Sequence, residues 1–174
     1  MGLNMSFNDF VNELNLANFS ASEILTKTGN TGNSTPPEAI WDNIGPTILM
    51  VQLVRTKFGV PITLNSVYRS ETYNRRIGGA KLSQHQAFCA IDFRPSRRDL
   101  LDDMADWLIS QRGKWIDAPR EYNRADVQIG GKSIPSKPID WRKNGGQTQF
   151  KFAGGVSLYT SFVHVDTRGI NANW

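Results

Sequence analysis

The chain has 174 residues, of which 39% are hydrophobic and 21% are charged. These values are typical of a soluble globular protein and exclude a disordered chain. The length suits one domain whose core needs no disulfide for support, and a single cysteine excludes an internal disulfide. We therefore predict one domain over residues 1–174, with a helical N-terminal part over about 1–58 and a core over about 60–174.

The net charge of +4 and the pI near 9.4 are mildly basic. Such a balance suits an anionic polymer such as a bacterial cell wall or a nucleic acid, but no dense run of Lys and Arg supports nucleic-acid binding. We expect no nucleic-acid partner. No segment has the roughly 18 apolar residues that a membrane span requires, and the N-terminus lacks the pattern of a signal peptide. The sequence thus predicts a monomer without membrane contact, synthesised in the cytoplasm.

Helical patterns dominate the first third of the chain. Apolar residues recur at near-helical spacing over residues 6–19, and turn-forming residues follow over 29–37. A clearer helix is predicted from Pro36 to Gly59, because apolar residues recur there every three or four positions. Gly45 and Pro46 lie inside this pattern and are expected to kink or divide the helix.

Strands and helices then alternate. Residues 61–66 read as a strand, and Ser70 is expected to cap a short helix that closes at Gly78 and Gly79. Residues 90–93 read as a second strand. An amphipathic helix follows to about Gln111, and the spacing of Ser96 and Asp99 predicts a capping box at its start.

The pattern is weaker beyond residue 113. Residues 127–129 and 148–152 favour strands, and residues 157–166 are predicted to form the last strand. Because side chains alternate along a strand, His164 and Asp166 should lie on one face of it.

Only two histidines occur in the chain, and each has an aspartate nearby. His85 precedes Asp92 by seven residues, and His164 precedes Asp166 by two. A catalytic zinc takes three protein ligands from imidazole nitrogen, thiolate or carboxylate oxygen, and leaves a fourth position for water. His85, Asp92 and His164 would form such a set if a loop and a strand bring them together. The alternative is that these are ordinary polar residues at strand ends.

Three segments resemble the zinc D-Ala-D-Ala carboxypeptidase family, which includes VanY- and VanX-type peptidases and many phage endolysins. The first, Ser83-x-His85-x-x-Phe88-x-Ala90-x-Asp92, is similar to the family signature Ser-x-His-x-x-Gly-x-Ala-x-Asp, with Phe88 in place of glycine. The others resemble the family's Ser-Gly-Tyr-Arg-Ser and His-Val-Asp-x-Arg-Gly motifs. They are Ser66-Val-Tyr-Arg69-Ser70 and His164-Val-Asp166-Thr-Arg168-Gly169.

The resemblance implies a small α+β domain, in which an antiparallel sheet carries a zinc site and helices pack on one side. It also implies that His85, Asp92 and His164 bind zinc. Arg69 matches the arginine that binds substrate and stabilises the oxyanion of the tetrahedral intermediate. Ser83 matches a serine that orients the site or the substrate, and the alternative for Ser83 is a hydrogen bond within its loop.

The general base does not follow from the motifs. Family members place a Glu or Asp three residues before the last histidine ligand, or a His two residues before it, and here these positions hold Ser161 and Phe162. Asp166 is the nearest ionisable residue. It is predicted either to take a proton from the zinc water or to hold a ligand histidine in the correct tautomer. Three acids elsewhere remain as further candidates: Glu121, Asp126 and Asp140.

Phe88 raises a separate question, because a glycine in that position can serve a backbone with positive φ or a close backbone approach. If either is required, the loop should differ locally from that of the family.

The resemblance favours a zinc metallopeptidase that hydrolyses peptide bonds in peptidoglycan, as a carboxypeptidase or as an endolysin-type endopeptidase. Its partner would be the wall peptide, which a phage-encoded enzyme reaches through a holin or a virion. The rival interpretation is a virion or wall-binding module that keeps the fold without cutting.

Overall fold

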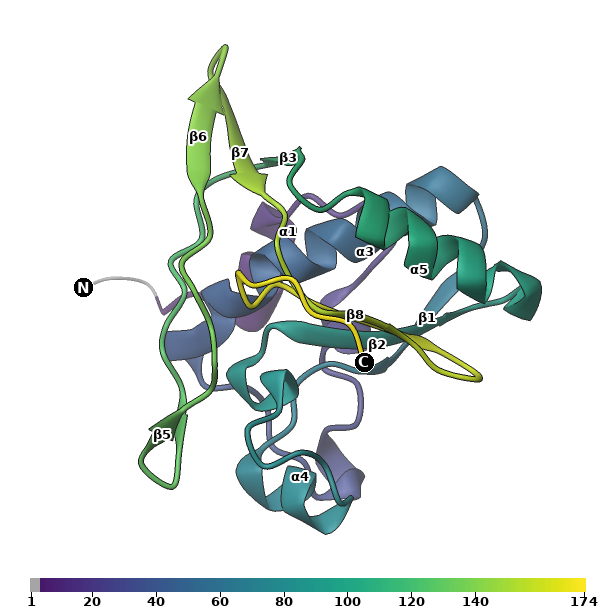
Figure 1. The fold of residues 1–174 in the computed structure, drawn as a ribbon. Helices are drawn as coiled ribbons and strands as arrows, with labels where there is room; N and C mark the ends of the chain where they lie inside the picture. Colours follow the sequence, from purple (N-terminus) through teal and green to yellow (C-terminus); the bar gives the residue numbers. More distant parts are fainter. Residues whose placement is uncertain (1–3) are drawn as a thin grey trace.

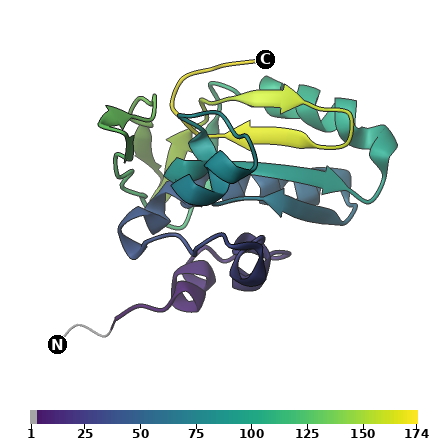
Figure 2. The same ribbon diagram turned by 90° about the horizontal axis from the view of Figure 1, so that it is seen from below.

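A four-stranded antiparallel sheet forms the centre of the computed structural model, which describes residues 4–174. Its strands lie side by side in the order β1, β2, β9, β8 (Figures 1 and 2). Residues 1–3 of the predicted N-terminal part lie outside the described range. The bounds of the four strands are Ile62–Ser66 for β1, Ala90–Pro95 for β2, Val163–Asp166 for β9 and Val156–Leu158 for β8.

The two central strands separate apolar from polar side chains. Alternation along β2 and β9 places Asp92 and His164 on one face. The residues that flank them along the two strands face the other way and are fully buried: Ile91, Phe93, Val163 and Val165. Helices α3 (Gly45–Phe58) and α5 (Leu101–Ser110) cover this apolar face (Figures 1 and 2). The opposite face carries the polar side chains Asp92 and His164, and neither α3 nor α5 covers it.

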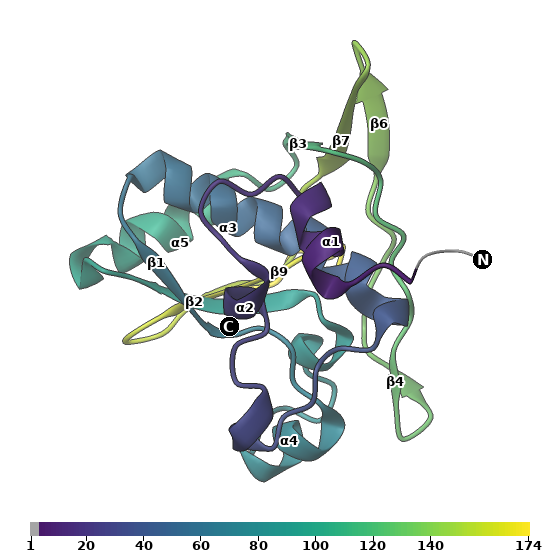
Figure 3. The ribbon, with the colours of Figure 1, turned by 180° about the vertical axis from the view of Figure 1, so that it is seen from behind.

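The first helices of the chain, which precede α3, lie beyond the β1 edge of the sheet (Figures 2 and 3). The helix expected over residues 6–19 is shorter than predicted: α1 spans Phe7–Glu13, and α2 spans Ala21–Ile24. Asn15 is left-handed, with φ of 52°, and ends the helical path. The predicted helix was too long because Leu14 and Phe19 continue the apolar spacing. Both are buried in the core although neither belongs to a helix.

The long helix predicted from Pro36 is divided at Gly45, as expected. A 3-10 helix, η2 (Glu38–Ile44), leads directly into α3, and Pro46 lies in the first turn of α3. Pro46 lacks a backbone N–H, but the first turn of an α-helix needs none there, so proline suits this position. A shorter 3-10 helix, η1, spans Gly29–Thr31 in the preceding turn region.

Helix α4 (Glu71–Arg76) begins as predicted, because the Ser70 hydroxyl accepts a hydrogen bond from the Tyr73 backbone. The capping box predicted from Ser96 and Asp99 is wrong. A 3-10 turn, η4 (Arg98–Leu100), precedes α5, and no side chain caps it. The Asp99 carboxylate binds the Arg97 guanidinium at 2.6 Å instead.

Two small sheets were only partly predicted. One has the order β3-β7-β6 and the other pairs β4 with β5. Strands β4 and β7 match the expected positions to within a residue or two, whereas β3, β5 and β6 were missed. Their bounds are Trp115–Ala118 for β3, Gln128–Ile129 for β4, Lys132–Ser133 for β5, Trp141–Asn144 for β6 and Gln147–Lys151 for β7.

The single last strand predicted over residues 157–166 is also wrong. The chain reverses between β8 and β9, and the Tyr159 N–H donates to the Phe162 carbonyl at 2.9 Å across the turn. The four turn residues, Tyr-Thr-Ser-Phe, include none of the Gly, Pro, Asn or Asp residues that usually mark a turn. The reversal therefore left little signal in the sequence.

One hydrophobic core joins the N-terminal helices, α3, α5 and the central sheet. Phe10 and Ile24 from the N-terminal part belong to the same cluster as Val51, Phe93 and Val165. The predicted α+β class with helices on one side of an antiparallel sheet is thus confirmed. Within residues 4–174, no helix is both long and apolar enough to cross a membrane.

Phe88, which replaces the motif glycine, adopts the backbone conformation that a glycine would favour. Its φ is 55°, in the left-handed region. The side chain is fully buried and packs edge-on against Tyr68, with ring centroids 5.9 Å apart. The left-handed conformation costs a residue with a Cβ about 1–2 kcal/mol. Burial of a phenylalanine ring more than offsets this cost.

We expect Phe88→Gly to destabilise the fold although it removes the backbone strain. Loss of the buried ring costs roughly 3–5 kcal/mol, and strain relief returns about 1–2 kcal/mol, so a net loss of about 1–4 kcal/mol should appear in urea denaturation. Asn15→Gly is the matched control, because Asn15 is left-handed but exposed. It should leave stability unchanged or slightly raised. A Phe88→Gly protein as stable as the parent would contradict this account.

Candidate metal centre

Three side chains from three different elements meet on the open face of the sheet. His85 comes from the 3-10 helix η3 (Gln84–Ala87), Asp92 from β2 and His164 from β9. Asp92 and His164 are paired directly across the two strands. All three are nearly inaccessible, with 3% to 6% of each residue exposed. The fold thus brings together residues that are up to 79 positions apart in the chain.

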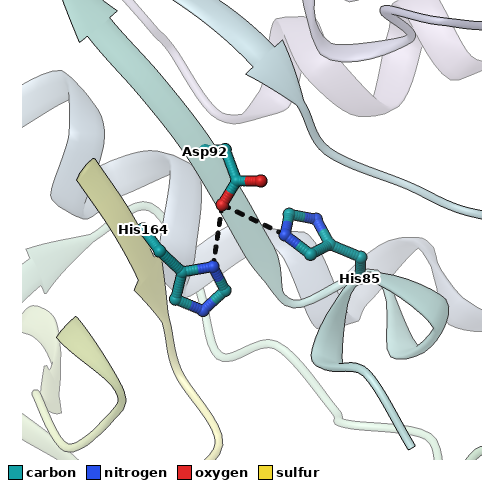
Figure 4. Close-up of side chains that lie close together, drawn as sticks. All are labelled: His85, Asp92 and His164. Atoms are coloured by element: carbon teal, nitrogen blue, oxygen red, sulfur yellow. Dashed lines mark hydrogen bonds and ion pairs between the residues drawn. The ribbon is translucent and has the colours of Figure 1, made fainter. Parts of the chain in front are cut away.

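The three side chains point toward one another (Figure 4). Asp92 Oδ1 lies 3.2 Å from His85 Nε2 and 2.8 Å from His164 Nδ1. One ligand atom from each residue lies within 4.8 Å of the other two. Ligand atoms at opposite ends of a tetrahedral edge around zinc are about 3.3 Å apart for bonds near 2.0 Å. The three ligand atoms are therefore close enough together to hold one small cation.

The hydrogen bonds of His85 determine which ring nitrogen is free. Its Nδ1 lies 2.7 Å from the Val67 carbonyl, which can only accept, so Nδ1 carries the proton. Burial lowers the pKa of His85, and Asp92 only partly opposes this effect. The lowered pKa favours the neutral ring. The Nε2 lone pair then faces the Asp92 carboxylate, and two acceptors 3.2 Å apart call for a cation between them.

His164 is held from its other side. Its Nε2 lies 3.0 Å from Asp166 Oδ2, and its Nδ1 faces Asp92. Burial alone would lower the pKa of His164, but the hydrogen bonds to Asp166 and Asp92 raise it above its usual value. A neutral ring that donates from Nε2 to Asp166 would direct the Nδ1 lone pair toward the centre.

Arg69 lies beside the centre and binds its carboxylate. One terminal nitrogen contacts Asp92 Oδ2 at 2.9 Å, and Nε donates to the Ser66 hydroxyl at 2.8 Å. Burial raises the pKa of Asp92, but the two histidines outweigh it and hold this pKa well below the usual range. Asp92 is therefore ionised at neutral pH.

Ser83 caps η3. Its hydroxyl accepts a hydrogen bond from the His85 backbone N–H at 3.3 Å, and its side chain also lines the pocket above the centre. This pocket has a volume of about 520 Å³. Ser83 thus makes the loop contact that was considered for it and lies where it can also contact a bound molecule.

Asp92 is the only carboxylic acid among the described residues that line this pocket. Glu121, Asp126 and Asp140 do not line it. Asp166 is completely buried behind His164, with its side chain 0% exposed. Ser161 does not line the pocket, and Phe162 presents an aromatic ring there.

Several residues of the site escaped the sequence reasoning. The Val67 carbonyl, which orients His85, is a backbone group without a signal in the sequence. Trp174 packs against His164, with ring centroids 5.1 Å apart, and its indole donates to the Tyr159 hydroxyl at 2.8 Å. Both aromatics line the pocket. Trp174 reaches Tyr159 because the β8–β9 turn places Tyr159 there, and the sequence did not reveal this turn.

Comparison with known proteins identifies the family of the chain. A family model for peptidase M15 matches residues 17–114, which is more than half of the chain and includes His85 and Asp92. Neither the curated proteins nor the solved structures contain a significant match. On the family match, the chain belongs to the peptidase M15 family, the zinc-dependent D-Ala-D-Ala carboxypeptidase family of metallopeptidases.

Proposed function

We propose that this protein is a zinc metallopeptidase that hydrolyses peptide bonds in bacterial peptidoglycan. The observation that carries the proposal is the neutral His85 imidazole, whose Nε2 lone pair faces the Asp92 carboxylate inside a pocket that also contains His164. A cation between these groups would satisfy the lone pair and the carboxylate together. The three motif segments favour peptidoglycan as the polymer, because they resemble the wall-cleaving branch of the family.

Zinc is the metal that fits the donor set. Two imidazole nitrogens and one carboxylate oxygen are typical ligands of a catalytic zinc, and a fourth position is left for water. Zinc in such a site supplies a water of lowered pKa, about 7, and polarises a substrate carbonyl. We assign His85 Nε2, Asp92 and His164 Nδ1 as the ligands.

Asp166 is best interpreted as the residue that orients His164. Every lone pair of its carboxylate is engaged: Oδ1 accepts from the backbone of Gly155 and from Arg168, and Oδ2 from His164 and Arg168. Burial raises its pKa, but these partners lower it well below the usual range. A carboxylate so strongly held is a poor proton acceptor. Of the two roles considered for Asp166, we therefore propose the positioning role.

Arg69 and Ser83 remain as substrate-contacting residues. Two nitrogens of Arg69 donate to Asp92 and Ser66. Its remaining N–H groups lie at the pocket wall and can bind a carbonyl or a carboxylate. The Ser83 hydroxyl can donate while its oxygen accepts from His85. These donors suit a peptide. If the gene is carried by a phage, a holin or a virion would bring the enzyme to the wall.

A wall-binding module that keeps the fold without cutting is the second candidate. The observation that favours it is the pocket lining, in which Asp92 is the sole acid among residues 4–174. Such a module would bind zinc and wall peptides but would release no product. Turnover therefore separates the two candidates.

The first prediction from the proposed function is that the purified protein binds about one zinc per chain. His85→Ala should abolish stoichiometric binding in metal analysis, whereas Gln86→Ala, a change in the same turn, should not. Because the pKa of His164 is raised, zinc must displace a proton from it at low pH, while His85 is already neutral. The apparent affinity should thus fall about tenfold per pH unit in acid, as for one proton. Unchanged zinc content in His85→Ala would remove this residue from the site.

The second prediction concerns activity on purified peptidoglycan. The wild-type protein should release peptide fragments or free D-amino acids that mass spectrometry identifies, and the masses will show which bond is cut. His164→Ala should reduce release to background, because it removes a ligand. Zinc binding by the wild type without any release would overturn the peptidase proposal and leave the wall-binding module.

The third prediction separates the two roles of Asp166. Asp166→Asn should weaken zinc affinity roughly 10- to 100-fold, as expected when the partner of a histidine ligand is changed. At saturating zinc the variant should recover most of its turnover. A general base would behave in the opposite way: zinc affinity would be preserved and turnover would stay low at any zinc concentration.

A further inference from the structure

The turn between β8 and β9 brings two aromatic side chains into the pocket. Tyr159 and Phe162 stack face to face, with ring centroids 4.4 Å apart and planes inclined by 10°. Both line the same pocket as His85, Asp92 and His164. The backbone hydrogen bond from Tyr159 to Phe162 closes the turn, and Tyr159 itself is 41% exposed.

The hydroxyl of Tyr159 forms a hydrogen bond with the indole of Trp174. The Trp174 indole donates to it at 2.8 Å, and an indole N–H cannot accept. The tyrosine oxygen therefore accepts from Trp174, and its own hydrogen stays available for another acceptor. Since the Trp174 ring also packs against His164, this hydroxyl is held on the His164 side of the pocket.

Other donors at the pocket wall are partly engaged, although Arg69 and Ser83 keep N–H and O–H groups that a substrate could bind. Two nitrogens of Arg69 serve Asp92 and Ser66, and Arg168 serves Asp166 with two of its nitrogens. Gln84 donates to the Pro135 carbonyl. Tyr159 and Ser83 are the lining hydroxyl groups, and only that of Tyr159 comes from the turn that precedes His164.

We propose that Tyr159 is a catalytic residue that donates a hydrogen bond to the oxyanion formed during peptide hydrolysis. In that reaction the oxygen of water bonds to the carbonyl carbon, and the carbonyl electron pair moves onto its oxygen. The C–N bond then breaks, and the amine leaves with a proton that came from water. Tyr159 keeps its proton throughout and stabilises the negative oxygen while it exists. This inference rests on the proposed peptidase function.

Tyr159→Phe tests the proposal, because it removes one hydroxyl and keeps the stacked ring. We expect kcat to fall about 10²-fold, as for loss of one oxyanion donor, with KM and zinc content unchanged. A phosphinate analogue of the scissile dipeptide carries a negative tetrahedral oxygen. Its affinity for the zinc-loaded variant, measured by calorimetry, should fall about 10- to 100-fold, while a ground-state peptide should bind as before.

Two further variants make the result decisive. Trp174→Phe removes the indole N–H and keeps the Tyr159 hydroxyl, so it should cost less than Tyr159→Phe in both measurements. Tyr73→Phe, which removes a phenol hydroxyl outside the pocket, should have no effect. Unchanged kcat and phosphinate affinity in Tyr159→Phe would overturn the proposal. So would an equal loss in Trp174→Phe, since Tyr159 would then serve only to anchor Trp174.

The outcome is distinguishable from failure of the peptidase function itself. If the wild type releases no product, the peptidase proposal fails and the catalytic role of Tyr159 fails with it. If the wild type is active and Tyr159→Phe is equally active, only the role of Tyr159 fails.

Discussion

The carboxylate of Asp92 lies between two imidazole rings in a nearly dry site, and the surrounding structure depends on this contact. Burial of an ionised carboxylate is costly unless positive groups compensate it. Arg69 compensates one oxygen, while the other faces His85 and His164. If both rings are neutral, the second oxygen faces two lone pairs, and a cation between them would compensate all three groups.

Each of the three candidate ligands is held by a different kind of contact, and each contact comes from the fold. Strand pairing fixes Asp92 opposite His164. The Val67 carbonyl, just after β1, fixes the tautomer of His85, and the Arg69 N–H returns a hydrogen bond to the His85 carbonyl at 3.1 Å. Asp166 fixes His164 from behind. Such outer contacts tune a metal site nearly as strongly as the ligands themselves.

The sequence predicted the three candidate ligands better than their surroundings. His85, Asp92 and His164 were found because histidines are rare in this chain and the flanking motifs are local. The apolar periodicity likewise predicted α3 and β2. The β8–β9 reversal was missed because its turn lacks glycine and proline. The contact of Trp174 with His164 was missed because it depends on tertiary packing, which no local pattern encodes.

Phe162 changes the electrostatics of the pocket as well as its shape. Around the centre, Arg69 balances Asp92 and Arg168 balances Asp166, so these four charges sum to zero. A divalent ion would therefore leave the site with a net charge of +2, whereas an added carboxylate from the turn would reduce this to +1. With a bound divalent cation, a turn without a carboxylate would favour bound anions more strongly, because charges interact strongly in a low-dielectric pocket. Neither Ser161 nor Phe162 provides a group that would take a proton from water. A neutral hydrogen-bond donor at the turn, such as the Tyr159 hydroxyl, would therefore suit the proposed anionic intermediate better than a second carboxylate would.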